Sequence, residues 1–213
     1  MKINSVEFIG AIGQPGQSPP DAARGLPQLA FSGRSNVGKS SLINRVTGRT
    51  RTAIARVSQQ PGKTLEINFY RVRTDRGDFL LVDLPGYGYA RVPRELKDRW
   101  EPLIRGYLGK SEELAGVVQL IDARQGATED DLRAVSFLGD LGVPVLFALT
   151  KADKLKRSGV EAALRRTARD LEVDADQLVP FSAPKGTGRK ELLESIEALL
   201  FADDAPQPPS EDG

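Results

Sequence analysis

The stretch GRSNVGKS at residues 33–40 decides the fold of this chain. It fills the pattern G-x-x-x-x-G-K-[ST] and directly follows the apolar residues 29–31, which is typical of a buried strand running into a phosphate-binding loop. The backbone N–H groups of such a loop point into one concavity and bind anionic oxygens, and the following helix adds its positive end. We therefore expect Lys39 to reach the β- and γ-phosphates of a nucleotide and Ser40 to bind Mg²⁺.

A second strand ends in the pattern D-x-x-G. Residues 80–86 read LLVDLPG, which puts the Asp83 carboxylate at the carboxyl end of a strand, near the metal, and lets the N–H of Gly86 contact a γ-phosphate. Taken alone, this pattern is more often an ordinary strand-to-turn junction. Its place in the order of the motifs favours the nucleotide interpretation.

Two later segments indicate that the base is guanine. The strand-like run VLFALT leads into KAD, a version of the [NT]-K-x-D signature that ends at Asp153. A carboxylate there can accept hydrogen bonds from both the ring N–H and the exocyclic amine of guanine, whereas adenine offers an acceptor at the ring position; the Lys151 stem covers the base. The short strand VPFSA then ends in Ser182 and Ala183, whose backbone N–H groups are expected to meet the guanine O6. The sequence thus predicts a site for GTP and GDP.

The ordered set GRSNVGKSS, PGKT, DLPGYGYA, TKAD and FSA resembles the EngB-type (YihA/YsxC-like) ribosome-biogenesis GTP-binding proteins of the Era-like group, over about residues 3–201. Generic small GTPases lack the tyrosine-glycine alternation after D-x-x-G. The resemblance implies a GTPase that uses Mg²⁺ and acts as a switch in assembly of the large ribosomal subunit, binding rRNA and ribosomal proteins. It also implies a requirement for normal cell division and septation. In this resemblance Thr64 closes over the γ-phosphate and ligates Mg²⁺ only in the triphosphate state.

The expected site combines these motifs. The residues expected to contact the nucleotide are Gly33, Arg34, Ser35, Asn36, Val37, Gly38, Lys39, Ser40, Ser41, Gly62, Lys63, Thr64, Asp83, Gly86, Thr150, Lys151, Asp153, Phe181, Ser182 and Ala183. The expected catalytic residues are Lys39, Thr64 and Gly86. The expected Mg²⁺ ligands are Ser40 and Thr64, with Asp83 acting through a water molecule.

Asn36 allows two interpretations. In cation-stimulated relatives of the Era-like group an asparagine at this place ligates K⁺ beside the phosphates, where the ion supplies the charge that an arginine finger gives elsewhere. Asparagine is also enriched in the left-handed backbone conformation that such a loop uses. The sequence leaves both interpretations open.

The chain departs from the best-known GTPase pattern at two positions. Tyr87 stands where many small GTPases have a glutamine that orients the attacking water. Thr150 replaces the usual asparagine before Lys151, which shortens the link from the base site to the phosphate loop. Both departures are normal in the EngB-type group, and they indicate slow intrinsic hydrolysis.

Apolar strand-like runs alternate with helical patterns in the second half of the chain, which indicates a parallel sheet covered by helices. Residues 65–72 alternate strictly and precede a turn at residues 75–78, as in a hairpin. The expected fold class is α/β: a P-loop GTPase (G domain) with a mostly parallel six-stranded sheet, one antiparallel edge strand and helices on both faces. We expect an N-terminal strand and loop extension over residues 1–25, the GTPase domain over 26–201, and an acidic disordered tail over 202–213.

Composition excludes several classes of chemistry. The chain has no cysteine and no histidine, so disulfides, thiol nucleophiles, Ser-His-Asp triads and cysteine or histidine metal sites are impossible. No apolar run approaches the roughly 18 residues of a membrane span, and the beginning MKINSVE lacks the core of a signal peptide. We therefore expect no membrane span and a cytoplasmic location. A monomer is also expected, although no feature of the sequence fixes the oligomeric state.

Charge is uneven although the net charge is only +1. Nine cationic residues stand against one acid over residues 34–73: Arg34, Lys39, Arg45, Arg49, Arg51, Arg56, Lys63, Arg71 and Arg73. A second cluster comprises Lys154, Lys156, Arg157, Arg165, Arg166 and Arg169. Such clusters are either an RNA-binding surface or solvated helix faces; RNA is favoured for the first, and both stay open for the second.

Two functions of other classes remain as alternatives. One is a P-loop kinase or ATPase that transfers phosphate to a small molecule, against which Asp153 counts because a kinase has no use for a guanine carboxylate. The other is a septum-associated interaction protein that does not act on ribosomes. The sequence does not separate this second alternative from an indirect effect of poor ribosome supply.

Overall fold

The structure is a computed structural model that describes residues 1–49, 54, 65–88 and 94–201. Within this part a single sheet has the strand order β1-β3-β4-β2-β5-β6-β7. The strands are β1 (Ile3–Ile12), β2 (Gln28–Gly33), β3 (Ile67–Thr74), β4 (Asp78–Asp83), β5 (Leu114–Asp122), β6 (Val145–Thr150) and β7 (Leu178–Pro180). The α-helices are α1 (Lys39–Val46), α2 (Arg94–Leu108), α3 (Glu129–Asp140), α4 (Arg157–Leu171) and α5 (Arg189–Leu200). Short 3₁₀ helices span Asp21–Ala23, Ala152–Lys154 and Ala175–Gln177.

The α/β P-loop GTPase fold is confirmed, but the sheet has seven strands where the sequence predicts six. The antiparallel strand β3 is also not the edge, because β1 pairs antiparallel with it from Ile3 opposite Thr74 to Ile12 opposite Ile67. An edge at β3 would leave a row of unpaired backbone N–H and C=O groups, which β1 covers. The N-terminal strand therefore belongs to the main sheet.

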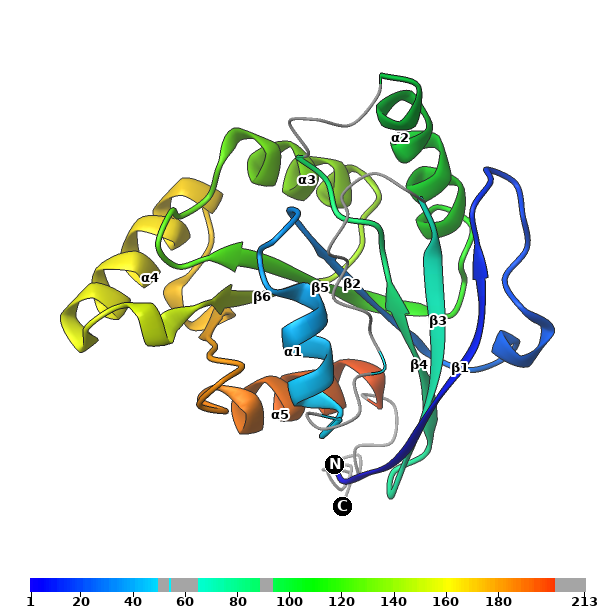
Figure 1. Cartoon of the computed structure of the whole chain (residues 1–213), viewed down its shortest axis with the longest axis horizontal. Helices are drawn as coiled ribbons and strands as arrows, with labels where there is room; N and C mark the ends of the chain where they lie inside the picture. Colours follow the sequence, from blue (N-terminus) through cyan, green and yellow to red (C-terminus); the bar gives the residue numbers. More distant parts are fainter. Residues whose placement is uncertain (50–53, 55–64, 89–93, 202–213) are drawn as a thin grey trace, which may run out of the picture.

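Helices cover both faces of the sheet, as expected (Figure 1). On one face α1 and α5 bury Leu42 and Ile196 against Phe31. On the other face, Leu103 of α2 and Leu138 of α3 are buried together with residues of β4. Helix α4 packs against β5 and β6. Burial on both faces explains why the central strands read as continuous apolar runs.

The parallel strands β2, β4, β5, β6 and β7 point the same way, so their carboxyl ends share one edge of the sheet. All four nucleotide motifs follow the ends of these strands. Ligands of open α/β sheets bind in the crevice outside such an edge. The topology therefore assembles the predicted site.

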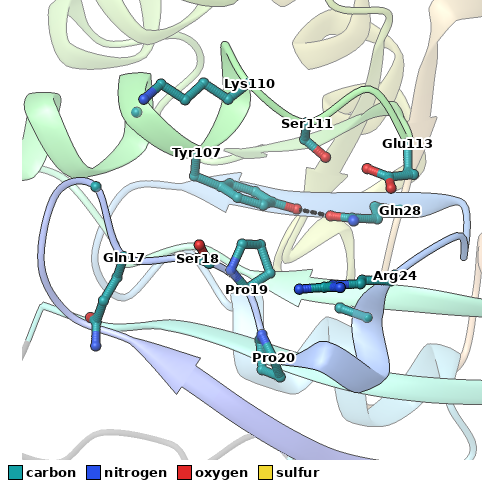
Figure 2. Close-up of a pocket in the computed structure, with 13 residues that line it drawn as sticks. Gln17, Ser18, Pro19, Pro20, Arg24, Gln28, Tyr107, Lys110, Ser111 and Glu113 are labelled. Carbon is teal, nitrogen blue, oxygen red and sulfur yellow. Dashed lines mark hydrogen bonds between the residues drawn. The ribbon is translucent and has the colours of Figure 1, made fainter.

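A pocket of about 370 Å³ lies at the opposite edge, between residues 16–24 and the end of α2 (Figure 2). Its buried wall includes Tyr107, whose hydroxyl donates to Gln28 Oε1 at 2.5 Å. Gln28 begins β2 and Gly33 ends it, so the pocket is separated from the phosphate loop by the length of that strand. None of the predicted nucleotide-binding residues lines it.

Candidate functional site

The phosphate loop joins the end of β2 to the start of α1. Asn36 has φ +64°, so the left-handed conformation that its sequence position allows is present. Its carbonyl accepts a hydrogen bond from Lys151 Nζ at 2.5 Å. The loop is therefore shaped by a residue of the guanine motif as well as by its own sequence.

Lys39, which the sequence predicts to bind phosphate, and the D-x-x-G carboxylate meet at this loop. Lys39 Nζ forms an ion pair with the Asp83 carboxylate, and both side chains are largely buried. Ser40 follows Lys39 at the start of α1, so a hydroxyl and a carboxylate are the oxygen donors here. Among the described residues no three acidic, histidine or cysteine side chains cluster as a metal cage. A site with a small number of protein oxygens beside the phosphates suits Mg²⁺, because this ion keeps several water ligands and binds the phosphates of its substrate.

The D-x-x-G glycine packs against the phosphate loop. A Cβ on Gly86 would lie 3.1 Å from Ser35 Oγ and 3.4 Å from the Gly33 carbonyl oxygen. The next residue is tied to the same loop, because the Tyr87 carbonyl accepts hydrogen bonds from Ser35 N at 2.9 Å and from Ser35 Oγ at 3.0 Å. A side chain at position 86 would therefore press on Ser35 and on the backbone of the phosphate loop.

The Tyr87 side chain belongs to a buried polar network. Its hydroxyl donates to Asp131 Oδ1 at 2.7 Å and accepts from Gln119 Nε2 at 2.6 Å. Its ring packs edge-on against Trp100, with 5.9 Å between centroids and 81° between planes. Burial, followed by the Asp131 charge, raises the pKa of Tyr87 far above its ordinary value, so the hydroxyl stays a donor. Tyr87 thus fixes the loop after D-x-x-G to α3 rather than replacing the glutamine of other GTPases.

Thr150 links the guanine motif to the phosphate loop, as the sequence predicts. Its hydroxyl lies 2.7 Å from the Val37 carbonyl oxygen and 3.1 Å from that of Ile121. Val37 lies in the phosphate loop and Ile121 lies in β5. This threonine therefore makes a direct bridge between the base and phosphate ends.

Lys151 is held from two sides. It has φ +58°, and its Nζ lies 3.0 Å from Asp122 Oδ2 in addition to its bond to Asn36. Burial alone would raise the pKa of Asp122, but hydrogen bonds from Arg124 and Lys151 lower this pKa to about 2. Asp122 is therefore a carboxylate at neutral pH, and it orients the lysine stem expected to cover the base.

Asp153 and the SA segment lie side by side. Ser182, which is 1% exposed, donates from Oγ to Asp153 Oδ1 at 2.9 Å. The Ser182 N–H is used by the Thr187 carbonyl at 3.0 Å, so it does not face a base as expected. In the described part of the chain no hydrogen bond occupies the N–H of Ala183, which leaves it as the candidate donor to O6. Phe181 is buried, and its N–H donates to the Leu149 carbonyl at 2.8 Å.

The remaining predicted residues fall into three groups. Gly62, Lys63 and Thr64 lie outside the described residues. The side chain of Arg34 hydrogen-bonds to Gln125 Oε1. Ser41 is on an exposed part of α1.

Several residues of this edge escaped the sequence analysis. Asp122 carried a usable signal, because it is a carboxylate at the carboxyl end of a predicted strand. Asp131 carried a signal for a helix start only, because it completes a capping-box pattern with Thr128. Gln119 carried none, since it is a single polar residue in an apolar strand.

The structure changes the interpretation of the first basic cluster. Arg71 pairs with Asp78 at 2.6 Å, and Arg45 donates to two backbone carbonyls, with Pro184 O at 2.8 Å. Together with Lys39 and Arg34, these side chains are engaged within the protein. Three members of the cluster, Arg51, Arg56 and Lys63, lie outside the described residues. Among the described members, Arg49 and Arg73 have no ion pair with a described residue.

No helix in the described ranges is long and apolar enough to cross a membrane.

Comparisons with known proteins agree with this geometry. A family model described as 50S ribosome-binding GTPase matches residues 28–151. A protein named Probable GTP-binding protein EngB from Gemmatimonas aurantiaca is 48% identical over 204 residues, covering 96% of this chain and 97% of the relative. One of the same name from Caldanaerobacter subterraneus is 42% identical over 200 residues, covering 94% and 99%.

Solved structures give the same result. A crystal structure of a probable GTP-binding protein EngB superposes with a TM-score of 0.66 at 26% identity, covering 82% of this chain and 99% of that one. Era in complex with MgGDPNP and nucleotides of 16S ribosomal RNA superposes with a TM-score of 0.67 at 23% identity, covering 88% and 59%. This second likeness concerns the fold.

Proposed function

This chain belongs to the EngB family of GTP-binding proteins and is a GTPase, and we propose that it acts as a switch in assembly of the large ribosomal subunit. In the triphosphate state it binds the assembling subunit, and after hydrolysis it leaves. The requirement for normal cell division and septation follows indirectly, because cells with too few ribosomes divide abnormally. The site of action is then the cytoplasm, and the protein works as a monomer.

The choice of guanine rests on one observation above all: Asp153 is oriented by Ser182 at 2.9 Å beside the N–H of Ala183. A carboxylate next to a single N–H donor complements the two donors and the O6 acceptor of guanine. With adenine, the Asp153 carboxylate would face the ring nitrogen, which is also an acceptor, so no hydrogen bond could form there. This arrangement supports the GTPase over a P-loop kinase or ATPase.

The phosphate end supplies the chemistry. Lys39 neutralises charge on the β- and γ-phosphates, and the N–H of Gly86 meets the γ-phosphate. Mg²⁺, when bound by Ser40 and Thr64 and through water by Asp83, adds positive charge at the same oxygens. Hydrolysis is slow because Tyr87 is engaged by Asp131 and does not orient water.

A monovalent cation completes this proposal. Asn36 is exposed at the mouth of the phosphate loop, which is where K⁺ would lie beside the phosphates. The cation offsets charge that develops on the transferring phosphoryl group, as an arginine finger does elsewhere.

Support for the ribosomal partner comes from the family and from charge. The matching family is described as ribosome-binding. Arg49 and Arg73 leave cationic groups for rRNA phosphates, whose contacts are sequence-independent and weaken with salt. We place the GTPase domain at residues 26–201, after an N-terminal extension at 1–25 whose strand β1 joins the sheet of that domain.

Sedimentation of cell extract tests this function. The protein should travel with the large subunit in the presence of a non-hydrolysable GTP analogue and stay at the top of the gradient with GDP. The matched control is Asp153→Asn, for which a xanthosine triphosphate analogue should replace the GTP analogue.

Equal distribution with the GTP analogue and with GDP would contradict a nucleotide-controlled partner. Sedimentation with the cell envelope and not with ribosomes would favour the septum-associated interaction protein.

A further inference from the structure

Two arginines connect helix α1 to the loop at residues 182–188 that follows β7. One of them, Arg45, belongs to the basic cluster that the sequence assigns to RNA. The other, Arg189, is the first residue of α5. Arg45 binds two backbone carbonyls in the loop that precedes Arg189. Arg189 in turn binds two backbone carbonyls at the end of α1, one of them that of Arg45 itself.

Arg45 holds the loop. Its Nε donates to the Ala183 carbonyl and its Nη2 to the Pro184 carbonyl, the second at 2.8 Å. Its guanidinium also lies 3.9 Å from the point where a Cβ on Gly186 would stand. Hydrogen bonds from a charged donor are stronger than those between neutral groups. The side chain of Arg45 is thus directed at the loop.

Arg189 holds the helix. Its Nε donates to the Arg45 carbonyl and its Nη2 to the Val46 carbonyl, both at 2.9 Å. These carbonyls belong to the last turn of α1, where backbone acceptors lack partners within the helix and a cation is favourable. Arg189 is therefore a cap of α1.

The loop presents one donor to the base, and its orientation is set on both sides of Ala183. On one side, the Ser182 carbonyl accepts from Gly186 N at 2.7 Å, which fixes the peptide plane that contains the Ala183 N–H. On the other side, Arg45 binds the Ala183 carbonyl. Rotation of the Ser182–Ala183 peptide would turn the N–H away, and the bond from Arg45 holds the following peptide, so Ala183 is fixed on both sides.

The loop closes so tightly that only glycine fits at its end. Gly188 has φ +77°, and a Cβ there would lie 2.2 Å from the Pro180 carbonyl oxygen. This close approach starts α5 directly beside β7 and places Arg189 at the end of α1.

From these contacts we infer that Arg45 is a positioning residue for guanine: it fixes the Ala183 N–H against O6 and couples that donor to the helix that carries Lys39 and Ser40. Arg189 stabilises the same helix without directing the base donor. This inference rests on the proposed function, since it assumes that the base lies at Asp153 and Ala183.

The test compares two nucleoside diphosphates on the same protein sample. GDP carries O6 and a ring N–H, whereas the 2-aminopurine riboside diphosphate lacks both and keeps the exocyclic amine and both phosphates. Asp153, which meets the ring N–H, is the same in wild type and variant, so a change in the ratio of the two affinities reports the contact to O6. Arg45→Met keeps the aliphatic stem and removes the guanidinium. We expect it to weaken GDP binding about tenfold, or about 1.4 kcal/mol, and to weaken the 2-aminopurine nucleotide less than twofold. Arg45→Lys should restore part of the difference.

Arg189→Met is the matched control, because it removes two hydrogen bonds from the same interface. It should lower the unfolding midpoint and weaken both nucleotides by the same factor, leaving their ratio unchanged. The ratio is independent of the fraction of protein that is folded. An Arg45→Met ratio equal to that of wild type would overturn the inference, whereas a wild-type ratio near one would overturn guanine recognition itself.

Discussion

The base end and the phosphate end of the site are held together in different ways. At the base end, Asp153 is oriented by Ser182, and Thr150 by backbone carbonyls. At the phosphate end, Lys39 and Asp83 are partners of each other. At Asp153 the base meets a loose ion pair, in which the exposed Lys154 Nζ lies 3.8 Å from Asp153 Oδ2, whereas phosphate and metal must exchange partners with the largely buried pair of Lys39 and Asp83. The comparison assigns specificity to a prebuilt region and switching to a region whose contacts change.

Removal of the guanine carboxylate is the largest expected effect and tests whether specificity belongs to the base end alone. Asp153→Asn loses two charge-assisted hydrogen bonds, so GDP affinity should fall at least about 150-fold, or about 3 kcal/mol. Xanthosine diphosphate should bind better, because the new amide donates to its carbonyl. Competition against a fluorescent nucleotide measures both. Wild-type protein that binds ATP as well as GTP would contradict the assignment.

Exchange of Na⁺ for K⁺ tests the phosphate end without touching the base end. GTP hydrolysis should be about tenfold faster in K⁺ at equal ionic strength, a barrier change of about 1.4 kcal/mol. Asn36→Ala should abolish the difference, while GDP affinity stays the same in both salts. Identical rates in the two salts would leave the ribosome as the activator.

Tyr87→Phe tests whether the polar network controls the phosphate end. The change removes the hydrogen-bond partner of Asp131 Oδ1 and one of the two acceptors of Gln119 Nε2, which should lower the free energy of unfolding by about 1–2 kcal/mol in urea titrations. GTP turnover should change because the loop after D-x-x-G loses its anchor, whereas GDP affinity should not.

Tyr107→Phe is the matched control, since it also removes a buried hydroxyl but lies at the opposite edge beside Gln28. It should reduce stability without altering turnover. Equal GTP turnover in Tyr87→Phe and Tyr107→Phe would show that the polar network around Tyr87 does not affect catalysis.

Acid titration gives the smallest effect and sharpens the account of the base end. The folded-state pKa of Asp122 is lowered to about 2, below its ordinary value of 3.8. Its contribution to stability is therefore complete above about pH 4 and is lost as the pH falls toward 2. Unfolding free energies of wild type and Asp122→Asn should differ at pH 7 and converge as the pH falls toward 2. A constant difference over this range would show that the charge is not what stabilises the protein.

The motifs were predictable because each one is a short local pattern at the end of a strand. The sequence identified Lys39, Asp83 and Asp153 separately, and parallel topology brought them to one edge. The direct link from Thr150 to the phosphate loop was also predictable, because a shorter side chain needs a closer partner.

What escaped prediction depends on contacts between distant residues. Arg45 and Ala183 are 138 positions apart, so nothing near either residue announces their bond. The position of β3 inside the sheet depended on β1, whose pairing is likewise set far along the chain. Charge counting also failed for Arg45, since a cation in a basic run serves equally well as a ligand for backbone carbonyls.

The steric limit at Gly188 has a genetic consequence. In a library that samples all codons and is selected for function, position 188 should retain glycine as strictly as the GKS triplet, although its side chain would contact no nucleotide. Positions 185 and 187, exposed in the same loop, should accept many codons. A map of tolerated substitutions would therefore identify Gly188, which matters for backbone geometry, as clearly as it identifies the residues expected to contact the nucleotide.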